Sequence, residues 1–455
     1  MATARKRIWG WYFFDWASQP YNTLLLTFVF GPYVAEVLGD GSAAQAAWGY
    51  GIGAAGVLIA LLAPFLGAMA DLGGRRIRWV AGFSVLYVVG ASGLWFAEPD
   101  DFDLVRTLVL FAVGLIGMEF ATIFTNAMLP TLGPARAVGR ISGTGWAFGY
   151  LGGLLALIAM LLFFAESGEG TTLLGIEPAF GLDPDAREGT RFVGPFTALW
   201  YAVFIIPFFL WVREPPGTGA LPPGAAARAA WPELKRTVAS LPRRPSLFSF
   251  LAASMLYRDA LNGFYFFGGI FAAGVLGWSV TEIGVFGILA VITSAVFAWI
   301  GGQADSRFGP KPVIVVCLLV LVALATTVVF LSRGSVFGLS VPPGSALPDI
   351  AFYVVGAGIG AAGGALQSSS RSMMCRQGSP QQMTEAFGLY ALAGKATAFL
   401  APLLVGVVTD ATGSQQAGIV PLIGLFLAGL ILLVWTKPDG ARDEWFLPPG
   451  PQPSR

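Results

Sequence analysis

Ionised and amide side chains interrupt several long apolar stretches of this sequence, and they are the groups there that could do chemistry. Two stretches carry a polar face with i, i+3, i+7 spacing: Asp15, Ser18 and Asn22, then Glu119, Thr122 and Asn126. A third has Arg258 and Asn262 on one face, with Asp259 turned about 100° away. Gln367 and Lys395 lie in two later stretches. An ionised group inside a bilayer costs from about 2.5 kcal/mol upward, so each is a hypothesis of function.

The composition argues against metal and enzyme chemistry. Histidine is absent, which removes the commonest metal ligand and any imidazole base. Cys317 lies within one apolar run and Cys375 at the end of another. These positions argue against both a disulfide and a zinc site. Residues 51–56 and 358–363 match the dinucleotide glycine spacing, but neither follows a strand, so helix packing explains them better. We expect no enzyme, metal, cofactor or nucleotide, and the net charge of +1 gives no reason to expect nucleic acid.

The elements that must position these side chains are membrane-spanning helices. The chain has 455 residues, 55% of them hydrophobic and 12% charged, with mean hydropathy +0.70. A core of this size could not hide so much apolar surface from water, so the solvent must be lipid. Twelve apolar stretches recur, at residues 12–38, 45–70, 79–97, 104–129, 142–165, 193–212, 248–275, 282–304, 312–331, 350–374, 385–409 and 416–436. The sequence predicts an all-α integral membrane protein with twelve transmembrane helices.

Basic residues alternate between the two sides of these helices and predict the orientation. One side carries residues 5–7, Arg75, Arg76, Arg78, Arg136, Arg140, Arg228, Lys235, Arg236, Arg243, Arg244, Arg307, Lys311, Arg376 and Lys437. The other side has few basic residues and many acidic ones. We therefore expect a multi-pass protein with both termini in the cytoplasm.

A short motif after the second stretch gives the most specific signal. It consists of Gly67, Asp71, Gly74, Arg75 and Arg76. This pattern resembles the loop signature of the major facilitator superfamily, except that Leu72 stands where a basic residue is usual. A related motif follows the eighth stretch, with one extra residue: Gly301, Asp305, Arg307, Gly309 and Lys311. The aspartates are 234 residues apart, about half the chain, as an internal duplication would give.

The resemblance implies two pseudo-symmetric six-helix bundles with helices one, four, seven and ten around a central cavity. The residues that it implies for the cavity, together with Lys395, are Asp15, Asn22, Glu119, Asn126, Arg258, Asp259, Asn262 and Gln367. The alternative is that these charges are buried pairs that hold helices together. The two loop motifs are expected to form a cytoplasmic gate, although their basic residues would also be explained by orientation alone.

The chain divides into six helices and six. We expect an N-terminal bundle at 1–213, a cytoplasmic linker at 214–247, a C-terminal bundle at 248–437 and a tail at 438–455. The linker is rich in proline, glycine and alanine and then becomes basic. Its second part is predicted either as an amphipathic helix on the lipid headgroups or as a disordered segment.

A closer resemblance comes from the opening Trp9–Ala17 segment, from Pro20, Tyr21 and Asn22, and from the glycine-rich run 143–153. These are similar to the vacuolar amino-acid effluxer-like branch of the superfamily. The resemblance implies a secondary transporter of an amino acid or related zwitterion. The compact loops suggest a bacterial cytoplasmic membrane.

The mechanism expected from these residues is alternating access to one site. Arg258, with or without Lys395, would hold a carboxylate, and Glu119 or Asp259 would hold an ammonium or a coupling proton. Without histidine, proton coupling requires a carboxylate whose pKa is raised by burial. Two alternatives remain: a proton-coupled exporter of drug-like or peptide compounds, and a membrane scaffold or sensor without flux.

Overall fold

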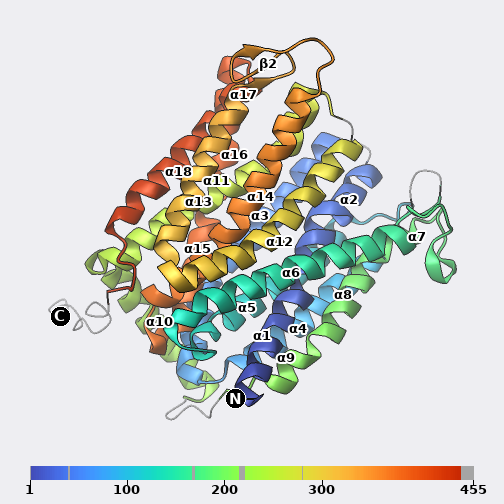
Figure 1. Cartoon of the computed structure of the whole chain (residues 1–455). Helices are drawn as coiled ribbons and strands as arrows, with labels where there is room; N and C mark the ends of the chain where they lie inside the picture. Colours follow the sequence, from blue (N-terminus) through green and yellow to red (C-terminus); the bar gives the residue numbers. More distant parts are fainter. Residues whose placement is uncertain (1, 39–40, 167–169, 215–220, 279, 442–455) are drawn as a thin grey trace. The chain divides into compact units, whose positions relative to one another are not determined.

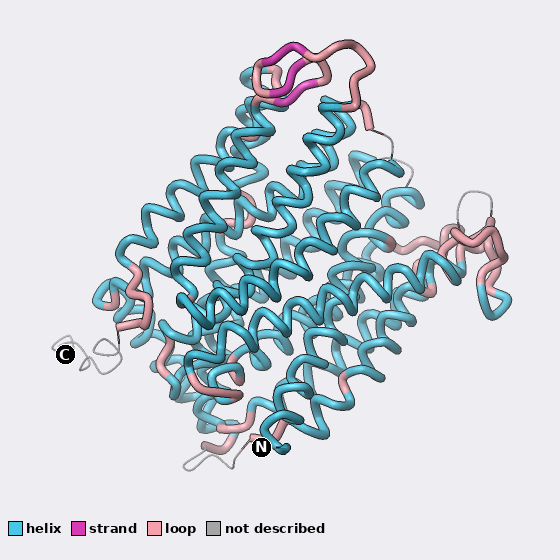
Figure 2. The backbone as a smooth tube through the Cα atoms, in the orientation of Figure 1, coloured by secondary structure: helices cyan, strands magenta, loops and turns pink. Residues whose placement is uncertain are grey.

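A computed structural model describes residues 2–441 of the chain, except 39–40, 167–169, 215–220 and 279. The described residues are almost entirely helical (Figure 2). Twelve of their helical segments are long and apolar enough to cross a membrane, which confirms the predicted spans: Ala4–Leu38, Gly51–Gly73, Arg76–Phe96, Leu104–Thr131, Ala135–Phe163, Glu188–Trp211, Pro245–Leu276, Glu282–Phe308, Pro310–Val329, Leu347–Gln377, Pro380–Thr412 and Gln415–Trp435.

The helices follow one another along the chain with short connections (Figure 1). They are α1 (Ala2–Pro20), the π-helix η1 (Tyr21–Phe28), α2 (Phe30–Leu38), α3 (Gly41–Gly73), α4 (Arg76–Gly93), α5 (Leu104–Asn126), α6 (Ala135–Phe163), α7 (Glu188–Arg191), α8 (Val193–Phe204), α9 (Ile206–Trp211), α10 (Pro223–Ser240), α11 (Pro245–Leu276), α12 (Val280–Phe308), α13 (Pro310–Val329), α14 (Leu347–Gln377), α15 (Met383–Ala396), α16 (Leu400–Thr412), α17 (Gln415–Gly418) and α18 (Val420–Leu432).

The chain forms two compact units that are not contiguous in sequence. Unit 1 comprises Met1–Ala63, Gly73–Met128 and Phe148–Leu221, and unit 2 comprises Pro64–Leu72, Leu129–Ala147 and Pro222–Arg455. The predicted division of the chain at residues 213, 247 and 437 separates the first six spans from the last six. This division stays a prediction. Residues 215–220 of the predicted linker and 442–455 of the predicted tail lie outside the described residues.

Proline residues explain why several spans are broken rather than continuous. Proline has no N–H to donate, so it is tolerated in the first turn of a helix and interrupts a helix interior. The first span has Pro20 before its π-helix and Pro32 in the first turn of α2. Pro207 lies in the first turn of α9, and Pro402 is the third residue of α16. The breaks in spans one, six and eleven therefore follow from the sequence.

Glycine lets the helices of unit 1 pack closely. A Cβ on Gly90 of α4 would lie 2.6 Å from the Gly114 Cα of α5. Beside this contact the rings of Tyr87 and Tyr201 stack with centroids 3.9 Å apart, and the Tyr201 hydroxyl is 2.7 Å from Ser84 Oγ. These helices form the rigid frame against which the first span lies.

Unit 2 contains the long helices α11, α12 and α14 and, among the described residues, one small sheet. A Cβ on Gly364 of α14 would lie 2.9 Å from the Ser294 Cα of α12, so these two helices are also in close contact. The sheet, which was not predicted, joins α13 to α14 in the antiparallel order β1 (Leu331–Ser332), β2 (Ser335–Val336) and β3 (Leu339–Ser340). Phe337 and Gly338, both with positive φ, form the two-residue turn between β2 and β3. In Figure 1 this sheet and α10 lie at opposite ends of the helices of unit 2.

Candidate functional site

The polar face predicted on the fourth span lies along a partly exposed stripe of α5. From Gly114 to Asn126 most residues of α5 are buried, but Glu119, Thr122 and Asn126 are only partly buried. The Thr122 hydroxyl donates to the Met118 carbonyl within its own helix. The structure therefore separates a packed face of α5 from a polar face, and Glu119 and Asn126 share the polar one.

The predicted site residues of the first span flank the transition from α1 to the π-helix. Asp15 and Asn22 are partly buried, and Asn22 is the second residue of η1. π-helical turns occur frequently at functional sites. Next to Asn22, the buried Tyr21 hydroxyl donates to the Phe111 carbonyl over 2.6 Å. This bond fixes the π-helix on α5, which also carries Glu119.

The glycine-rich fifth span lies against this part of α1. Cβ atoms on Gly149 and Gly152 of α6 would lie 3.1 Å from the Asp15 carbonyl and 2.8 Å from the Trp16 carbonyl, respectively. The glycines that carried the resemblance thus place α6 directly beside Asp15.

In unit 2, the predicted residues of the seventh span lie on a partly exposed stripe of α11. Arg258 is partly buried, and Asn262 and Tyr265 are exposed at the i+4 and i+7 positions. The Tyr265 hydroxyl lies beside Gln367 of α14. Arg258, Asn262 and Gln367 therefore lie along one side of neighbouring helices, whereas Asp259 does not.

Arg258 contacts the eleventh span just before its break. Its Nη1 donates to the Tyr390 carbonyl over 3.0 Å, and its guanidinium lies 4.3 Å from the centre of the Tyr390 ring. A Cβ on Gly394 would lie 2.6 Å from the guanidinium carbon, so Gly394 leaves the space that Arg258 occupies. Lys395, the next residue, is partly buried in the last turn of α15.

Asp259 is buried, with 2% exposure, and faces the break in the eleventh span. Its Oδ2 accepts the backbone N–H of Ala401, in the first turn of α16, over 2.9 Å. Its Oδ1 has no hydrogen-bond partner among the described residues. A carboxylate at a helix N-terminus satisfies an otherwise unpaired N–H and interacts favourably with the helix dipole. Asp259 thereby positions the second half of the eleventh span.

The first predicted gate motif is a helix cap. Asp71, in the last turn of α3, accepts the Thr384 hydroxyl over 2.6 Å, the Thr384 N–H over 3.2 Å and the Glu385 N–H over 2.9 Å. Thr384 and Glu385 are the second and third residues of α15, so the carboxylate holds the N-terminus of that helix. A Cβ on Gly67 would lie 2.6 Å from the Thr384 carbonyl, which explains the glycine four residues earlier.

The rest of the first motif turns the chain into α4. Gly74 has a φ of 70°, in the left-handed region that ends many helices, and follows α3 directly. Arg75 is exposed before the first turn of α4. Arg76 lies 3.9 Å from Glu214 of the same unit, and the other Glu214 oxygen accepts the Ile77 N–H over 3.0 Å.

The second predicted gate motif places its aspartate differently. Asp305 is completely buried, and neither of its carboxylate oxygens accepts a well-oriented hydrogen bond from the described residues. Its carboxylate faces Arg376, whose Nη2 is 3.9 Å from Oδ1. Gly139 of α6 leaves room for the carboxylate. Ser306, the next residue, accepts the backbone N–H of Arg140 in the first turns of α6 over 2.8 Å.

Further contacts of the second motif join α12 to α14, and α13 to the end of the twelfth span. A Cβ on Gly301 would lie 2.7 Å from the Ala365 Cβ of α14. Arg307 lies against the Phe308 ring, with its guanidinium carbon 5.2 Å from the ring centre. Lys311 donates to the Thr436 carbonyl over 2.8 Å, after the last helical turn of the twelfth span.

Sequence analysis did not single out Arg371 as a gate residue. It is buried on α14, and it donates to the Ser142 hydroxyl over 2.9 Å and to the Ser142 carbonyl over 2.7 Å. The Ser142 hydroxyl donates in turn to the Ser368 carbonyl over 2.7 Å. Thr384 and Glu385 were also missed, although a threonine and a glutamate at the start of an apolar stretch are a recognisable helix N-terminus.

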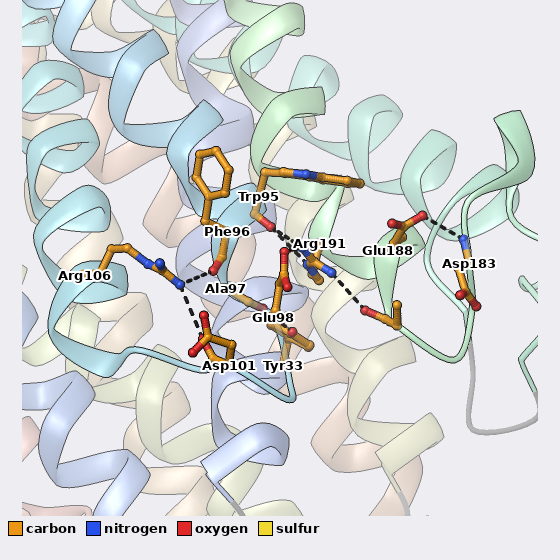
Figure 3. A network of polar contacts seen from close by, with 11 residues as sticks. Tyr33, Trp95, Phe96, Ala97, Glu98, Asp101, Arg106, Asp183, Glu188 and Arg191 are labelled. Atoms are coloured by element: carbon orange, nitrogen blue, oxygen red, sulfur yellow. Dashed lines mark hydrogen bonds and ion pairs between the residues drawn. The ribbon is translucent and has the colours of Figure 1, made fainter.

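A further network of polar contacts in unit 1 joins the end of the third span to the start of the sixth (Figure 3). Arg191 is buried, donates twice to the Trp95 carbonyl and pairs with Glu98 over 2.8 Å. The Tyr33 hydroxyl donates to the Ala97 carbonyl over 2.5 Å. These bonds tie α2 and the start of the sixth span to the end of the third.

The comparisons with known proteins agree with this architecture. The family model described as "Vacuole effluxer Atg22 like" matches residues 32–445. An uncharacterized MFS-type transporter of Bacillus subtilis, YxiO, is 23% identical over 95% of both chains. Autophagy-related protein 22 of Coccidioides immitis is 28% identical over 65% of this chain, and the match covers 47% of that protein. This chain spans about half the length of such fungal relatives.

Solved structures show the same fold at low identity. The human organic anion transporter MFSD10 has a TM-score of 0.69 and 18% identity, covering 94% of this chain and 99% of its own. The proton:xylose symporter XylE has a TM-score of 0.67 and 13% identity, covering 97% and 98%. Fold and family are those of secondary transporters, not enzymes. The chain belongs to the Atg22-like vacuole effluxer family of the major facilitator superfamily.

Proposed function

We propose that this transporter moves an amino acid or a related zwitterion. The observation that carries the proposal is the polar stripe of α5, where Glu119, Thr122 and Asn126 are partly exposed in the mostly buried C-terminal half of the helix. Arg258 and Asn262 form a comparable stripe on α11. Arg258 would hold the carboxylate of the cargo, and Glu119 would hold its ammonium or carry a coupling proton.

The remaining predicted cavity residues take supporting roles in this proposal. Asn22, in the π-helix, and Gln367, beside Tyr265, would hydrogen-bond the cargo. Lys395 would add to the positive charge near Arg258, and Asp15 would contact cargo or balance that charge. Asp259 would act by positioning α16, because one of its oxygens already accepts the Ala401 N–H.

The two loop motifs would form the gate at the cytoplasmic end, with both chain termini on the same side. Asp71 and the first turns of α6 precede the linker in sequence, yet both contact helices that follow it. Release of these bonds would let the cytoplasmic end open in alternating access. The description of the family as effluxers supports export, and the compact chain supports a cytoplasmic membrane.

The test of the cargo is uptake into proteoliposomes of a panel of amino acids under imposed pH gradients. We expect saturable flux of at least one amino acid, abolished in Arg258→Gln. Flux of none of them, in protein that retains its thermal unfolding transition, would contradict the proposed cargo.

The test of coupling compares Glu119→Gln with Asp410→Asn, which removes an exposed carboxylate from α16. We expect Glu119→Gln to lose the pH dependence of net flux while exchange of bound cargo continues, and Asp410→Asn to behave as the parent. If pH dependence survives in Glu119→Gln, Glu119 is not the proton carrier.

A further inference from the structure

The connecting helix α10 presents a stripe of basic and apolar side chains to its surroundings. Arg228, Trp231, Lys235 and Val238 are all exposed, with Trp231 at 54% and Val238 at 47%. Their spacing of i, i+3, i+7 and i+10 places them on one face. The Lys235 ammonium lies 5.2 Å from the centre of the Trp231 ring. A tryptophan beside lysine and arginine is the composition of a helix that lies in the headgroup region of a bilayer.

The opposite face of α10 is packed against the protein. Ala226, Ala230, Leu234 and Thr237 are buried, at 2%, 0%, 8% and 7% exposure. This helix is therefore neither a disordered linker nor a helix detached from the protein. One face of α10 packs against the protein, and the opposite face is exposed.

The open face lies close to the level at which the seventh span begins. α10 ends at Ser240, and α11 starts at Pro245 after a single 3-10 turn. Phe248, in the first turn of α11, is 52% exposed, as expected of a side chain that meets lipid. The segment from α10 to the start of α11 carries five basic residues against one acidic residue: Arg228, Lys235, Arg236, Arg243 and Arg244, with Glu233.

The packed face of α10 contacts the residues next to the Asp71 cap. Glu233 accepts a hydrogen bond from the Gln382 side chain over 2.8 Å. Thr237 lies beside the buried Glu385 carboxylate. Asp71 accepts the backbone N–H of Glu385. A displacement of α10 would therefore reach the Asp71 cap through a single residue, Glu385.

We propose that α10 is a binding surface for anionic lipid headgroups, and that its attachment to the bilayer stabilises the Asp71 cap. Arg228 and Lys235 would bind phosphate oxygens while Trp231 enters the interface. Each basic residue near an anionic surface contributes roughly a fivefold change in partitioning. The consequence for gating rests on the proposed gate, whereas the lipid surface does not.

The experiment measures amide hydrogen exchange of the full chain in nanodiscs of phosphatidylcholine, with and without phosphatidylglycerol. We expect exchange in residues 223–240 to slow by at least about fivefold in the anionic discs. The variant Arg228→Gln/Trp231→Ala/Lys235→Gln should lose this response. Arg333→Gln, which removes an exposed cation beside the β-sheet, should keep it. Because all substituted side chains are exposed, unchanged protection of α11 and α14 will confirm that the variants fold.

Equal exchange of α10 in both kinds of disc would overturn the proposal, as would a response that survives the triple substitution. Protection that depends on two copies per disc rather than on the lipid would assign the stripe to a second copy of the chain instead. The amides of Thr384 and Glu385 should slow together with α10. If α10 responds and these amides do not, its coupling to the gate is refuted, and the proposed transport is unaffected.

Discussion

Asp71 and Asp305 occupy equivalent places in the two predicted gate motifs, yet they make different contacts. Asp71 is partly buried and accepts three hydrogen bonds at the start of α15. Asp305 is completely buried and faces Arg376 at 3.9 Å, while the neighbouring Ser306 accepts the N–H of Arg140 at the start of α6. The first motif caps the N-terminus of α15 with a carboxylate, whereas the second contacts the sixth residue of α6 through a hydroxyl.

The extra residue in the second motif accompanies this difference. Three positions separate Asp71 from Gly74, and four separate Asp305 from Gly309. Both glycines have positive φ, at 70° and 86°, which residues with a Cβ rarely adopt. The two motifs therefore contact the eleventh and the fifth span, respectively, through different groups. Since a charged acceptor makes stronger hydrogen bonds than a neutral one, the Asp71 side should be the stronger gate.

The largest effect is expected from Asp71→Ala. It removes three hydrogen bonds to an ionised group and leaves the first N–H groups of α15 without this partner, at a cost of about 2–4 kcal/mol. Exchange of the Thr384 and Glu385 amides should accelerate roughly a hundredfold. Asp305→Ala should leave these two amides unchanged, and acceleration by both substitutions would mean that the two motifs are not independent.

A smaller effect is expected from Gly67→Ala. The added Cβ would lie 2.6 Å from the Thr384 carbonyl and 2.9 Å from the Glu385 Cα, so backbone must move, at about 1–3 kcal/mol. Gly56→Ala is the matched control in the same helix, because no atom lies within 4 Å of its Cβ position. Thermal unfolding of both variants in detergent will measure the difference, which should be absent if α3 can slide past α15.

The smallest effect is expected from Ser306→Ala. It removes one neutral acceptor from the backbone N–H of Arg140, the sixth residue of α6, which typically costs about 1 kcal/mol. Exchange of the Arg140 amide should accelerate about fivefold, and Ser306→Thr should restore it. An effect as large as that of Asp71→Ala would remove the asymmetry between the two gates.

Most of the fold was predictable because hydropathy alone determines which segments must be helical in lipid. All twelve spans were found, and Gly67, Asp71 and Gly74 marked the segment whose aspartate caps α15. That this segment gates transport stays a prediction. The cap itself was not predicted, because Asp71 and Thr384 are 313 residues apart and no local pattern relates them. The contact of Arg371 with Ser142, which are 229 residues apart, was not predicted for the same reason.

The candidate site was predictable to the level of helix faces. Spacing alone placed Glu119 with Asn126 and separated Arg258 from Asp259, as the structure also does. The break in the eleventh span, which gives Asp259 its position, was not predicted, although Pro402 was a signal for it. Whether these faces bind cargo stays a prediction.

The most direct test of the account is a reversible covalent closure of the first gate. The variant Asp71→Cys/Thr384→Cys, with Cys317 and Cys375 replaced by alanine, joins two positions whose side chains are in contact. In proteoliposomes, oxidation should stop flux and reduction should restore it. Flux through each single-cysteine variant should not change on oxidation. Full flux through protein shown by mass spectrometry to be cross-linked would contradict alternating access through this gate.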